Sequence, residues 1–513
     1  MTFAYHSPLY FAGFLPLVVI VYRLFPKKYR WIVLLLANYA FFFIWSRWLL
    51  IYNVISTLIT YVFGRILGNM KKAPEGVDKK AFKKKKSRIM TLGILLNLGM
   101  LVVLKYTNFI GTNFANLFHF EFHTVNWLVP IGISYYTLQA ISYLVDVRDR
   151  KLEPADHLYK LAVYMSFFAT IMEGPISLYK DVGEDLCAGH DVTYENLSVG
   201  FERILLGLFK KIMIADHMAA AVKVIYMNYT TDGAIALLGA VLVTLQLYMD
   251  FAGTIDIAIG SARIIGVTLP ENFRQPFFAK NASEFWRRWH ITLGVFLRTY
   301  VFYPVFVSKP VQKITKWTKK HIGKQAANYV GPMIALFCVW ICNGLWHGPQ
   351  WTYILYGMYY CVIIFVEMLL EEPVKKFNEK HNIDENGWGL RIFRFIKLFI
   401  IVILGELFFM APDAATGWRM IVSIFTDFHI SSLAENWLNL NMGVHDYVIV
   451  AAGYVIIFVW GVLKEKNYPL REKFESWPTP ARWGFLYAVI LAVILFGAYG
   501  PGYDAVAMMY AGF

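Results

Sequence analysis

The chain has 513 residues, of which 58% are hydrophobic, 17% aromatic and only 16% charged, and it carries a formal net charge of +14. Soluble domains contain about 25% charged residues, so this composition excludes a soluble multidomain enzyme, a disordered chain and a secreted disulfide scaffold. It predicts an all-α polytopic membrane protein, and the positive-inside rule explains the basic excess without nucleic-acid binding.

Five apolar stretches in the N-terminal part predict membrane-spanning helices, because backbone amides in lipid must be paired within the segment. They cover residues 8–25, 31–45, 49–67, 89–106 and 127–147. The first has no basic leader or small-residue cleavage motif, so we interpret it as a retained span. Basic loops alternate along this part with loops poor in Lys and Arg. The basic loops include a polar run at 71–88, which contains KKKK at 83–86, and RDRK at 148–151. This alternation predicts an extracellular N-terminus and cytoplasmic lysine-rich loops.

The C-terminal part repeats this pattern, with apolar stretches at 331–345, 351–370, 393–410, 446–462 and 483–499. It predicts an extracellular C-terminus. Between the two parts, apolar runs are interrupted by Gly174-Pro175, charged residues and other polar groups, which membrane interiors tolerate only inside protein or a cavity. We therefore predict one membrane-embedded domain over 1–513, with N-terminal spans in 1–156, a catalytic core with re-entrant segments in 157–365, and C-terminal spans in 366–513.

The first candidate site lies in residues 279–300, AKNASEFWRRWHITLGVFLRTY. Ser283 is a plausible N-cap, and Trp286 and His290 follow with helical spacing. One interpretation is an amphipathic interfacial helix. The other is that Arg287 and Arg288 bind phosphate groups of a donor while His290 faces a cavity.

The second candidate is the segment NGLWHGPQW at 343–351, between two long apolar runs. Gly348 and Pro349 break the helix directly after His347. A buried imidazole can take a proton from a hydroxyl and later release it. The alternative is a packed structural histidine.

Other polar groups have structural interpretations. Asp250 and Asp256 are six residues apart and do not share a helical face; we expect them to pair with basic residues, with Lys210, Lys211 and Arg274 as candidates. In the span that contains Ser134 and Gln139, close helix packing explains most of the pattern, and a lining role in a polar tunnel is the alternative. The cysteines, Cys187, Cys338, Cys342 and Cys361, are interpreted as packing residues, and no metal site is expected.

The chain resembles the membrane-bound O-acyltransferase (MBOAT) superfamily, in the bacterial branch of alginate O-acetyltransferases and teichoic acid D-alanyl transfer proteins. The similar segments span about residues 1–365 and occur in the order SPLYF, VPIGISYYTLQAISYLVDV, EGPI, MDFAGTIDIAIGSARIIGVTLPENFRQPFFAKNASEFWRRWHITL and NGLWHGPQWTYILYGMYY. The sequence contains no Walker A loop, G-x-S-x-G elbow, H-E-x-x-H motif or Rossmann fingerprint. Nucleotide hydrolysis, serine hydrolysis and zinc proteolysis therefore lack support.

The resemblance implies a ring of about ten to twelve transmembrane helices around a central funnel, with re-entrant or broken helices. It implies an acyltransferase that moves an acyl group other than an aminoacyl group, most simply acetyl. His347 matches the family's essential histidine and His290 its second histidine. Predicted substrate- or donor-binding residues are Asn343, Arg287, Arg288, Trp286, Trp346, Ser134 and Gln139.

The same resemblance implies a bacterial cell membrane location and no permanently bound cofactor. The donor would be acetyl-CoA or another acyl thioester, with CoA or an acyl carrier protein as its carrier. The acceptor would be a cell-envelope polysaccharide. The expected partners are an extracellular SGNH-hydrolase-like protein, which would finish the transfer outside, and membrane lipid. Alternatives are D-alanyl transfer from a carrier protein to teichoic acid, a membrane transporter that uses Asp250 and Asp256 as an ion path, and a scaffold for partner proteins. The absence of internal repeats disfavours the transporter.

Overall fold

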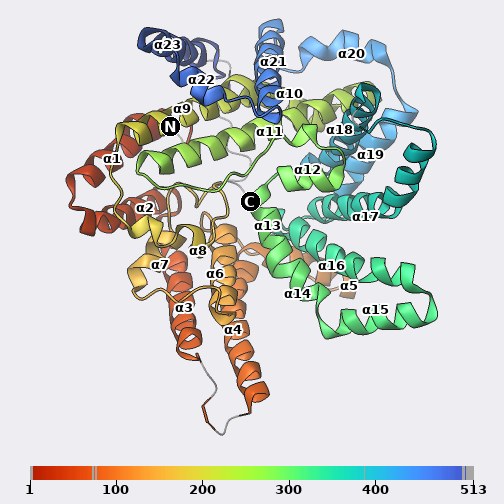
Figure 1. The fold of residues 1–513 in the computed structure, drawn as a ribbon. Helices are drawn as coiled ribbons and strands as arrows, with labels where there is room; N and C mark the ends of the chain where they lie inside the picture. The colour runs from red at the N-terminus through yellow and green to blue at the C-terminus, as the bar shows by residue number, and fades with distance from the viewer. Residues whose placement is uncertain (1–3, 72–73, 76–77, 386, 500–502, 504–513) are drawn as a thin grey trace. The chain divides into compact units, whose positions relative to one another are not determined.

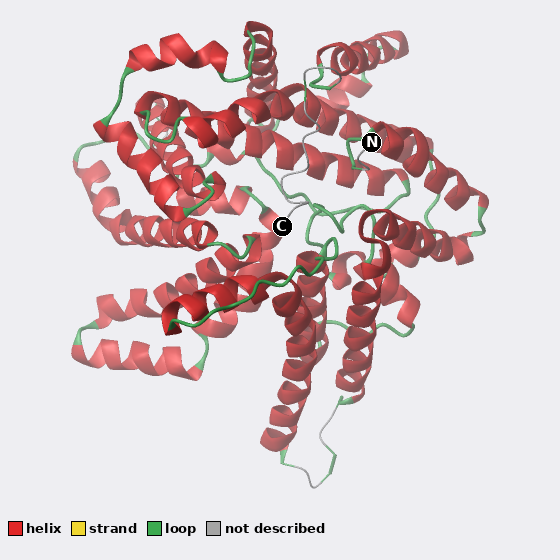
Figure 2. Cartoon of the chain, turned by 180° about the vertical axis from the view of Figure 1, so that it is seen from behind, coloured by secondary structure: helices red, strands yellow, loops and turns green. Residues whose placement is uncertain are grey.

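The computed structural model describes residues 4–71, 74–75, 78–385, 387–499 and 503. All regular structure among these residues is helical, and Figure 2 shows helices joined by loops without a strand in the described part. The chain forms two compact units. Unit 1 contains the described residues of Met1–Ile204 and Thr254–Pro270, and unit 2 contains those of Leu205–Gly253 and Glu271–Met509. The segment 157–365, predicted as the catalytic core, therefore contributes to both units.

Unit 1 is built from helices of different lengths. Helix α3 (Leu50–Asn69) packs against α4 (Lys79–Leu101) and α6 (Ile133–Arg148), which also pack against each other (Figure 1). Two long helices, α9 (Tyr194–Lys210) and α11 (Gly233–Ile264), contribute residues to both units. The other helices of unit 1 are η1 (Tyr10–Phe14), α1 (Leu15–Leu24), η2 (Lys27–Tyr29), α2 (Arg30–Ser46), η3 (Arg47–Leu49), α3 (Leu50–Asn69), α4 (Lys79–Leu101), η4 (Val102–Tyr106), α5 (Thr107–Phe118), α6 (Ile133–Arg148), α7 (Leu158–Met165), α8 (Tyr179–Val182) and η5 (Asp185–Cys187).

Helix α4 begins earlier than the sequence predicted. The run at 71–88 is expected to be a polar loop, but its lysine-rich half is the first part of α4. The Asp78 side chain caps this helix by accepting hydrogen bonds from the backbone N–H groups of Lys80 and Ala81, at 3.0 and 3.1 Å. Because lysine is a good helix former and the cap satisfies two free amides, the helix extends beyond its apolar part.

Helix α6 is shorter than the predicted span at 127–147. It begins at Ile133, after Gly132 in a left-handed conformation with φ 72°. A β-carbon on Gly132 would lie 2.3 Å from the carbonyl oxygen of Ile171, so this turn requires glycine. With 16 residues, α6 rises about 24 Å, less than the roughly 30 Å of a bilayer's hydrocarbon core.

Unit 2 contains the C-terminal helices and both candidate histidines. Helix α16 packs against α15 and α17, and α17 also packs against α18. The helices of this unit are η6 (Lys211–Ala215), α10 (Asp216–Asn228), η7 (Pro276–Phe278), α12 (Ala282–Arg288), α13 (Ile291–Leu297), η8 (Arg298–Phe302), α14 (Tyr303–Phe306), α15 (Lys309–His321), α16 (Lys324–His347), α17 (Trp351–Lys380), α18 (Trp388–Met410), α19 (Ala414–Thr426), α20 (Ile430–Asn436), η9 (Trp437–Asn439), α21 (Val444–Glu465), α22 (Leu470–Glu475) and α23 (Thr479–Phe496).

Seven helical runs among the described residues are long and apolar enough to cross a membrane, or eight if the pair Ile291–Phe306 and Lys309–His321, bent by 59°, is one span. This confirms the all-α polytopic fold class and the prediction of a broken helix. The number is below the predicted ten to twelve for physical reasons. The expected spans 31–45 and 49–67 are the separate helices α2 and α3, which meet at Arg47 with φ 47°, but they are counted together as the run Lys27–Asn69. Helix α18 is not counted, because it carries Arg394, Lys397 and Glu406 within its apolar part.

The two carboxylates of α11 are both in ion pairs. In unit 2, Lys211 Nζ lies 3.1 Å from Asp250 Oδ1 and 2.6 Å from Asp216 Oδ1. The pairing of Asp250 with Lys211 confirms one predicted partner. In unit 1, Asp256 Oδ1 lies 2.7 Å from Arg203 Nε, a partner that the sequence did not predict. These contacts support a structural role for the two aspartates.

Replacing Lys211 with Met tests how much unit 2 depends on this buried pair. The Lys211 side chain is completely buried, and the substitution leaves two buried carboxylates without their cation. Breaking such a pair costs about 3–5 kcal/mol, so we expect a marked drop in the melting temperature of the purified protein in detergent.

The matched control is Lys71→Met, which removes the ion pair with Glu153. These side chains are 71% and 82% exposed, and solvent-exposed pairs contribute little. An unchanged melting temperature for Lys71→Met is therefore expected. If Lys211→Met were equally stable, the structural role of the buried pair would be wrong.

Candidate active site

The segment around His290 consists of two short helices, α12 and α13, with a break between them. Asn281 caps α12 by accepting a hydrogen bond from the backbone N–H of Glu284 at 2.8 Å. The prediction of Ser283 as the N-cap is wrong, because α12 begins at Ala282 and Asn281 is therefore its N-cap. Trp289 is extended and His290 is left-handed, with φ 45°. The helical spacing predicted through this segment is therefore interrupted immediately before the histidine.

Asn272 holds this break in place from a separate loop. Its carbonyl oxygen accepts a hydrogen bond from Ile291 N at 3.0 Å. Its side-chain Oδ1 lies 3.0 Å from both the backbone nitrogen and the hydroxyl of Thr292, and 3.1 Å from His290 Nδ1. A left-handed residue other than glycine costs about 1–3 kcal/mol and persists where its surroundings fix it. The contacts of Asn272 supply that constraint.

His347 is the last residue of α16, and the chain leaves the helix at Gly348 in extended conformation. Asn343 lies one helical turn earlier, and its side-chain Oδ1 is buried without a hydrogen bond from any described residue. Beside it, α16 and α17 approach closely: a β-carbon on Gly344 would lie 2.6 Å from the carbonyl oxygen of Tyr353. The predicted helix end after His347 is confirmed.

Aromatic rings surround the imidazole of His347. The ring centroids of Trp346 and Phe409 lie 5.0 and 5.2 Å from it. Those of Tyr353 and Tyr356 lie 6.1 Å away. Aromatic side chains therefore form much of the immediate surroundings of this ring.

Trp346 joins the two candidate histidines. Its ring lies 5.3 Å from the His290 ring and 5.0 Å from the His347 ring, measured between centroids. Phe251 contacts His290 from another side at 4.8 Å. The exposed fractions of His290 and His347 are only 2% and 4%. Two histidines that are distant in the sequence therefore lie in one buried aromatic cluster within unit 2.

The buried carboxyl group of Glu406 is hydrogen-bonded to a tyrosine of this cluster. Tyr356, which contacts His347, donates a hydrogen bond from its hydroxyl to Glu406 Oε1 at 3.0 Å. The ring of Trp286, a predicted substrate-binding residue, lies 4.8 Å from that of Tyr360 and 5.0 Å from that of Trp340, measured between centroids. It also contacts Tyr356, at 6.2 Å. The Nε1 atoms of both tryptophans are buried and have no hydrogen-bond partner among the described residues.

The two arginines of the first motif have different environments. Arg288 forms ion pairs with Glu284 at 2.7 Å and Glu465 at 2.6 Å, and its side chain is 18% exposed. Burial opposes ionisation of Glu284, but hydrogen bonds from Lys280 N and Arg288 outweigh it and lower the pKa of this carboxyl. Arg287 is exposed. Of these two arginines, Arg288 is held by carboxylates, whereas no ion pair with a described carboxylate is found for the Arg287 guanidinium.

Ser134 and Gln139 belong to unit 1, whereas the other predicted site residues belong to unit 2. Both lie in α6 and are buried. Ser134 Oγ accepts a hydrogen bond from Lys105 Nζ at 3.1 Å. The structure does not bring these two residues together with the histidines inside one unit.

Sequence reasoning missed Asn272 and Glu406 as neighbours of the site. Asn272 is in the segment LPENF, directly before the histidine motif, and its complete burial has no sequence signal. Glu406 is a single carboxylate within an apolar run, and that alone could have marked it as functional. Among the described residues, no group of three or more His, Cys, Asp or Glu side chains could hold a metal ion. Two buried imidazoles can transfer protons and form hydrogen bonds.

Comparison with known proteins identifies a family match across the site. The profile described as MBOAT, membrane-bound O-acyltransferase family, matches residues 124–410. This range contains His290 and His347 together with Asn272, Trp346 and Glu406. It covers more than half of the chain.

Curated relatives extend the similarity over most of the chain. A probable alginate O-acetylase of Azotobacter vinelandii is 30% identical over 465 residues, 89% of this chain and 84% of the relative. A peptidoglycan O-acetyltransferase of Helicobacter pylori is 26% identical over 529 residues, 92% of each chain. A teichoic acid D-alanyltransferase of Bacillus subtilis is 31% identical over 270 residues, 51% of this chain and 64% of the relative.

Replacing each arginine with alanine separates structural support from donor binding. Arg288→Ala removes both ion pairs and leaves Glu284 and Glu465 without their partner, so we expect a loss of stability of about 1–3 kcal/mol. Arg287→Ala should leave the melting temperature unchanged. If Arg287 binds a phosphate of the donor, its loss raises the KM for that donor. Equal melting temperatures for the two variants would contradict the assigned difference.

Proposed function

Because this chain belongs to the membrane-bound O-acyltransferase family, we propose that it transfers an acetyl group from a cytoplasmic thioester to hydroxyl groups of an extracellular cell-envelope polysaccharide. The family and the apolar helices make it a multi-pass membrane acyltransferase.

The extent of similarity to acetylating relatives carries the choice of acetyl group. The alginate and peptidoglycan acetylating proteins match 89% and 92% of this chain. The D-alanyltransferase matches 51%. Its 31% identity over that part keeps D-alanyl transfer to teichoic acid as the second candidate.

We assign His347 as the general base. Its imidazole takes the proton of an acceptor hydroxyl while the hydroxyl oxygen attacks the thioester carbonyl carbon. The tetrahedral intermediate then collapses, the carbon–sulfur bond breaks, and the proton passes from the imidazolium to the leaving thiolate. The products are an ester and a free thiol. In this proposal the side-chain NH₂ group of Asn343, one turn from His347, donates a hydrogen bond to the carbonyl oxygen as negative charge develops on it.

The burial of His347 supports this chemistry. A thioester held away from water is protected from hydrolysis, and hydrogen bonds in such surroundings are stronger than in water. Because the ring is 4% exposed and surrounded by aromatic side chains, an entering substrate must displace part of that covering. Trp346 contacts both histidines. Displacement of its side chain would therefore expose both imidazoles to the substrate.

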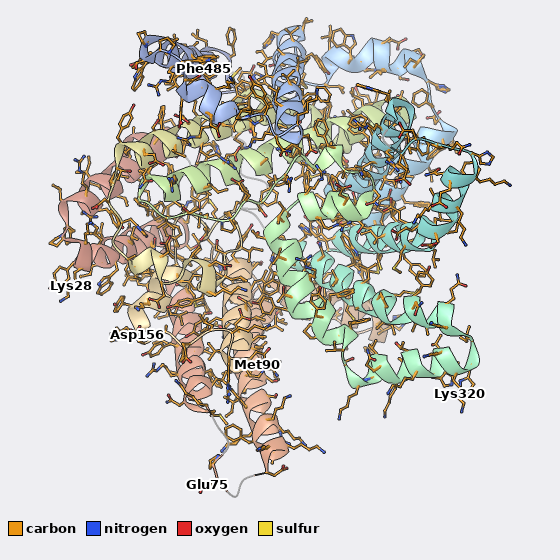
Figure 3. All side chains as sticks on the ribbon, in the orientation of Figure 1. Lys28, Glu75, Met90, Asp156, Lys320 and Phe485 are labelled. Atoms are coloured by element: carbon orange, nitrogen blue, oxygen red, sulfur yellow. The ribbon has the colours of Figure 1, made fainter. Side chains whose placement is uncertain are left out.

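Two lysine-rich helices support a cytoplasmic donor. The first part of α4 carries the run KKKK, and α15 carries five lysines, among them Lys320, labelled in Figure 3. Such segments stay on the cytoplasmic side of bacterial membranes. They suit the phosphates of CoA or an acidic carrier protein. We also propose an extracellular SGNH-hydrolase-like protein as a partner on the acceptor side of the membrane.

His347→Ala tests the assignment of the general base. Loss of a general base lowers rates by about 10²–10⁴-fold, so we expect transfer from a labelled acetyl thioester to fall by this factor. The control is His321→Gln, which changes an exposed histidine of α15 in the same unit and should leave transfer unchanged. Both proteins must insert and show wild-type melting temperatures. Near wild-type transfer by His347→Ala would exclude this residue as the base.

The transferred group is tested by the esters on envelope polymers. Cells that lack this protein should lose acetyl esters from a cell-envelope polysaccharide, as measured by mass spectrometry of purified polymers. Wild-type protein should restore them, and His347→Ala should not. Loss of D-alanyl esters instead would favour the second candidate, and unchanged esters of both kinds would refute an acyltransferase role on these polymers.

A further inference from the structure

The hydrogen bonds of Asn272 determine which nitrogen of His290 carries a proton. Three groups converge on Asn272 Oδ1: the backbone N–H of Thr292 at 3.0 Å, the Thr292 hydroxyl at 3.0 Å, and His290 Nδ1 at 3.1 Å. A backbone N–H can only donate. The atom that receives it is therefore the carbonyl oxygen of the amide and not its nitrogen, which settles the orientation of the Asn272 side chain.

The orientation of Asn272 fixes the tautomer of His290. An amide oxygen accepts hydrogen bonds and cannot donate, so His290 Nδ1 must be the donor. In a neutral imidazole only one nitrogen carries hydrogen, which leaves a lone pair on Nε2. Neutral His290 can accept a hydrogen bond at Nε2 but cannot donate one there.

His290 Nε2 has no hydrogen-bond partner among the described residues, although the atom is buried. Leaving a buried acceptor without a donor is energetically unfavourable, and such atoms in native proteins call for an explanation. Around this ring the structure places Phe251 and Trp346 at 4.8 and 5.3 Å. A bound substrate that donates a hydrogen bond to Nε2 would satisfy it.

We infer that Asn272 is a positioning residue that holds His290 in the Nδ1–H tautomer, so that Nε2 accepts a hydrogen bond from an O–H or N–H group of a bound substrate. This inference rests on the proposed acyl transfer. The O–H would belong to the acceptor sugar and the N–H to an amide of the thioester donor. In either case neutral His290 binds a substrate group and does not stabilise the oxyanion, because its lone pair would repel negative charge.

Asn272→Leu removes the acceptor for Nδ1 while keeping a similar volume. We expect transfer to fall by about ten- to a hundredfold, the usual effect of losing a group that orients a functional histidine. A rise in KM for the acceptor identifies the hydroxyl as the group bound to Nε2, and a rise in KM for the donor identifies the amide. Wild-type kcat and KM for both substrates in the folded variant would overturn the inference.

Thr292→Val is the matched control. It removes the Thr292 hydroxyl from Asn272 Oδ1 but leaves the His290 contact. We expect transfer close to wild type. A loss as large as that of Asn272→Leu would mean that Asn272 acts only by supporting the loop, and would overturn the inference.

Asn272→Asp provides a test if Asn272→Leu fails to fold. The carboxylate still accepts the Nδ1 proton but also stabilises the protonated imidazole. The acidic limb of the pH–rate profile should therefore move to higher pH, with activity recovered at alkaline pH. An unmoved profile would count against the inference.

The tautomer can be observed without an activity assay. In protein labelled with ¹⁵N-histidine, solid-state NMR distinguishes a protonated from an unprotonated ring nitrogen, and the difference spectrum against His290→Gln assigns the signals. We expect a protonated Nδ1 and an unprotonated Nε2. A protonated Nε2 in neutral His290 would refute the inference even if acyl transfer were demonstrated, whereas inactive wild-type protein with the expected tautomer would refute only the proposed function.

Discussion

Buried polar groups in this chain must find partners within the protein, because membrane lipid offers none. This requirement explains the contacts around which unit 2 is organised. Lys211 holds two carboxylates, Tyr356 donates to Glu406, and Asn272 holds the break at His290. Each contact joins segments that hydrophobic packing alone would leave free to slide, since apolar side chains match lipid as well as they match each other.

The same requirement separates what could be predicted of the fold from what could not. The apolar stretches at 331–345 and 351–370 correspond to α16 and α17. Both helices extend further, because helix formation does not stop where hydrophobicity does; α17 continues through Lys380. Conversely, the apolar run at 127–147 becomes a helix only from Ile133. Hydrophobicity locates the apolar stretches, whereas capping and glycine turns decide where these helices begin.

For the candidate site, local sequence located the chemistry but not its surroundings. The helix end after His347 could be predicted from Gly348 and Pro349, since both act on the adjacent backbone. A cation beside Asp250 could be predicted because a buried carboxylate requires one. The choice of Arg203 for Asp256 could not, because several basic residues satisfied the same condition. The contacts of Asn272 and Trp346 with the histidines depend on tertiary folding, for which one sequence carries no signal.

The shared indole of Trp346 has an evolutionary consequence. Because one side chain touches both imidazoles, a substitution near either histidine alters the packing of the other. Mutations in the two segments should therefore show epistasis, with the effect of one depending on the residue present at the other. Changes in this aromatic cluster would have to proceed through compensating pairs of substitutions, which restricts the routes by which it can be remodelled.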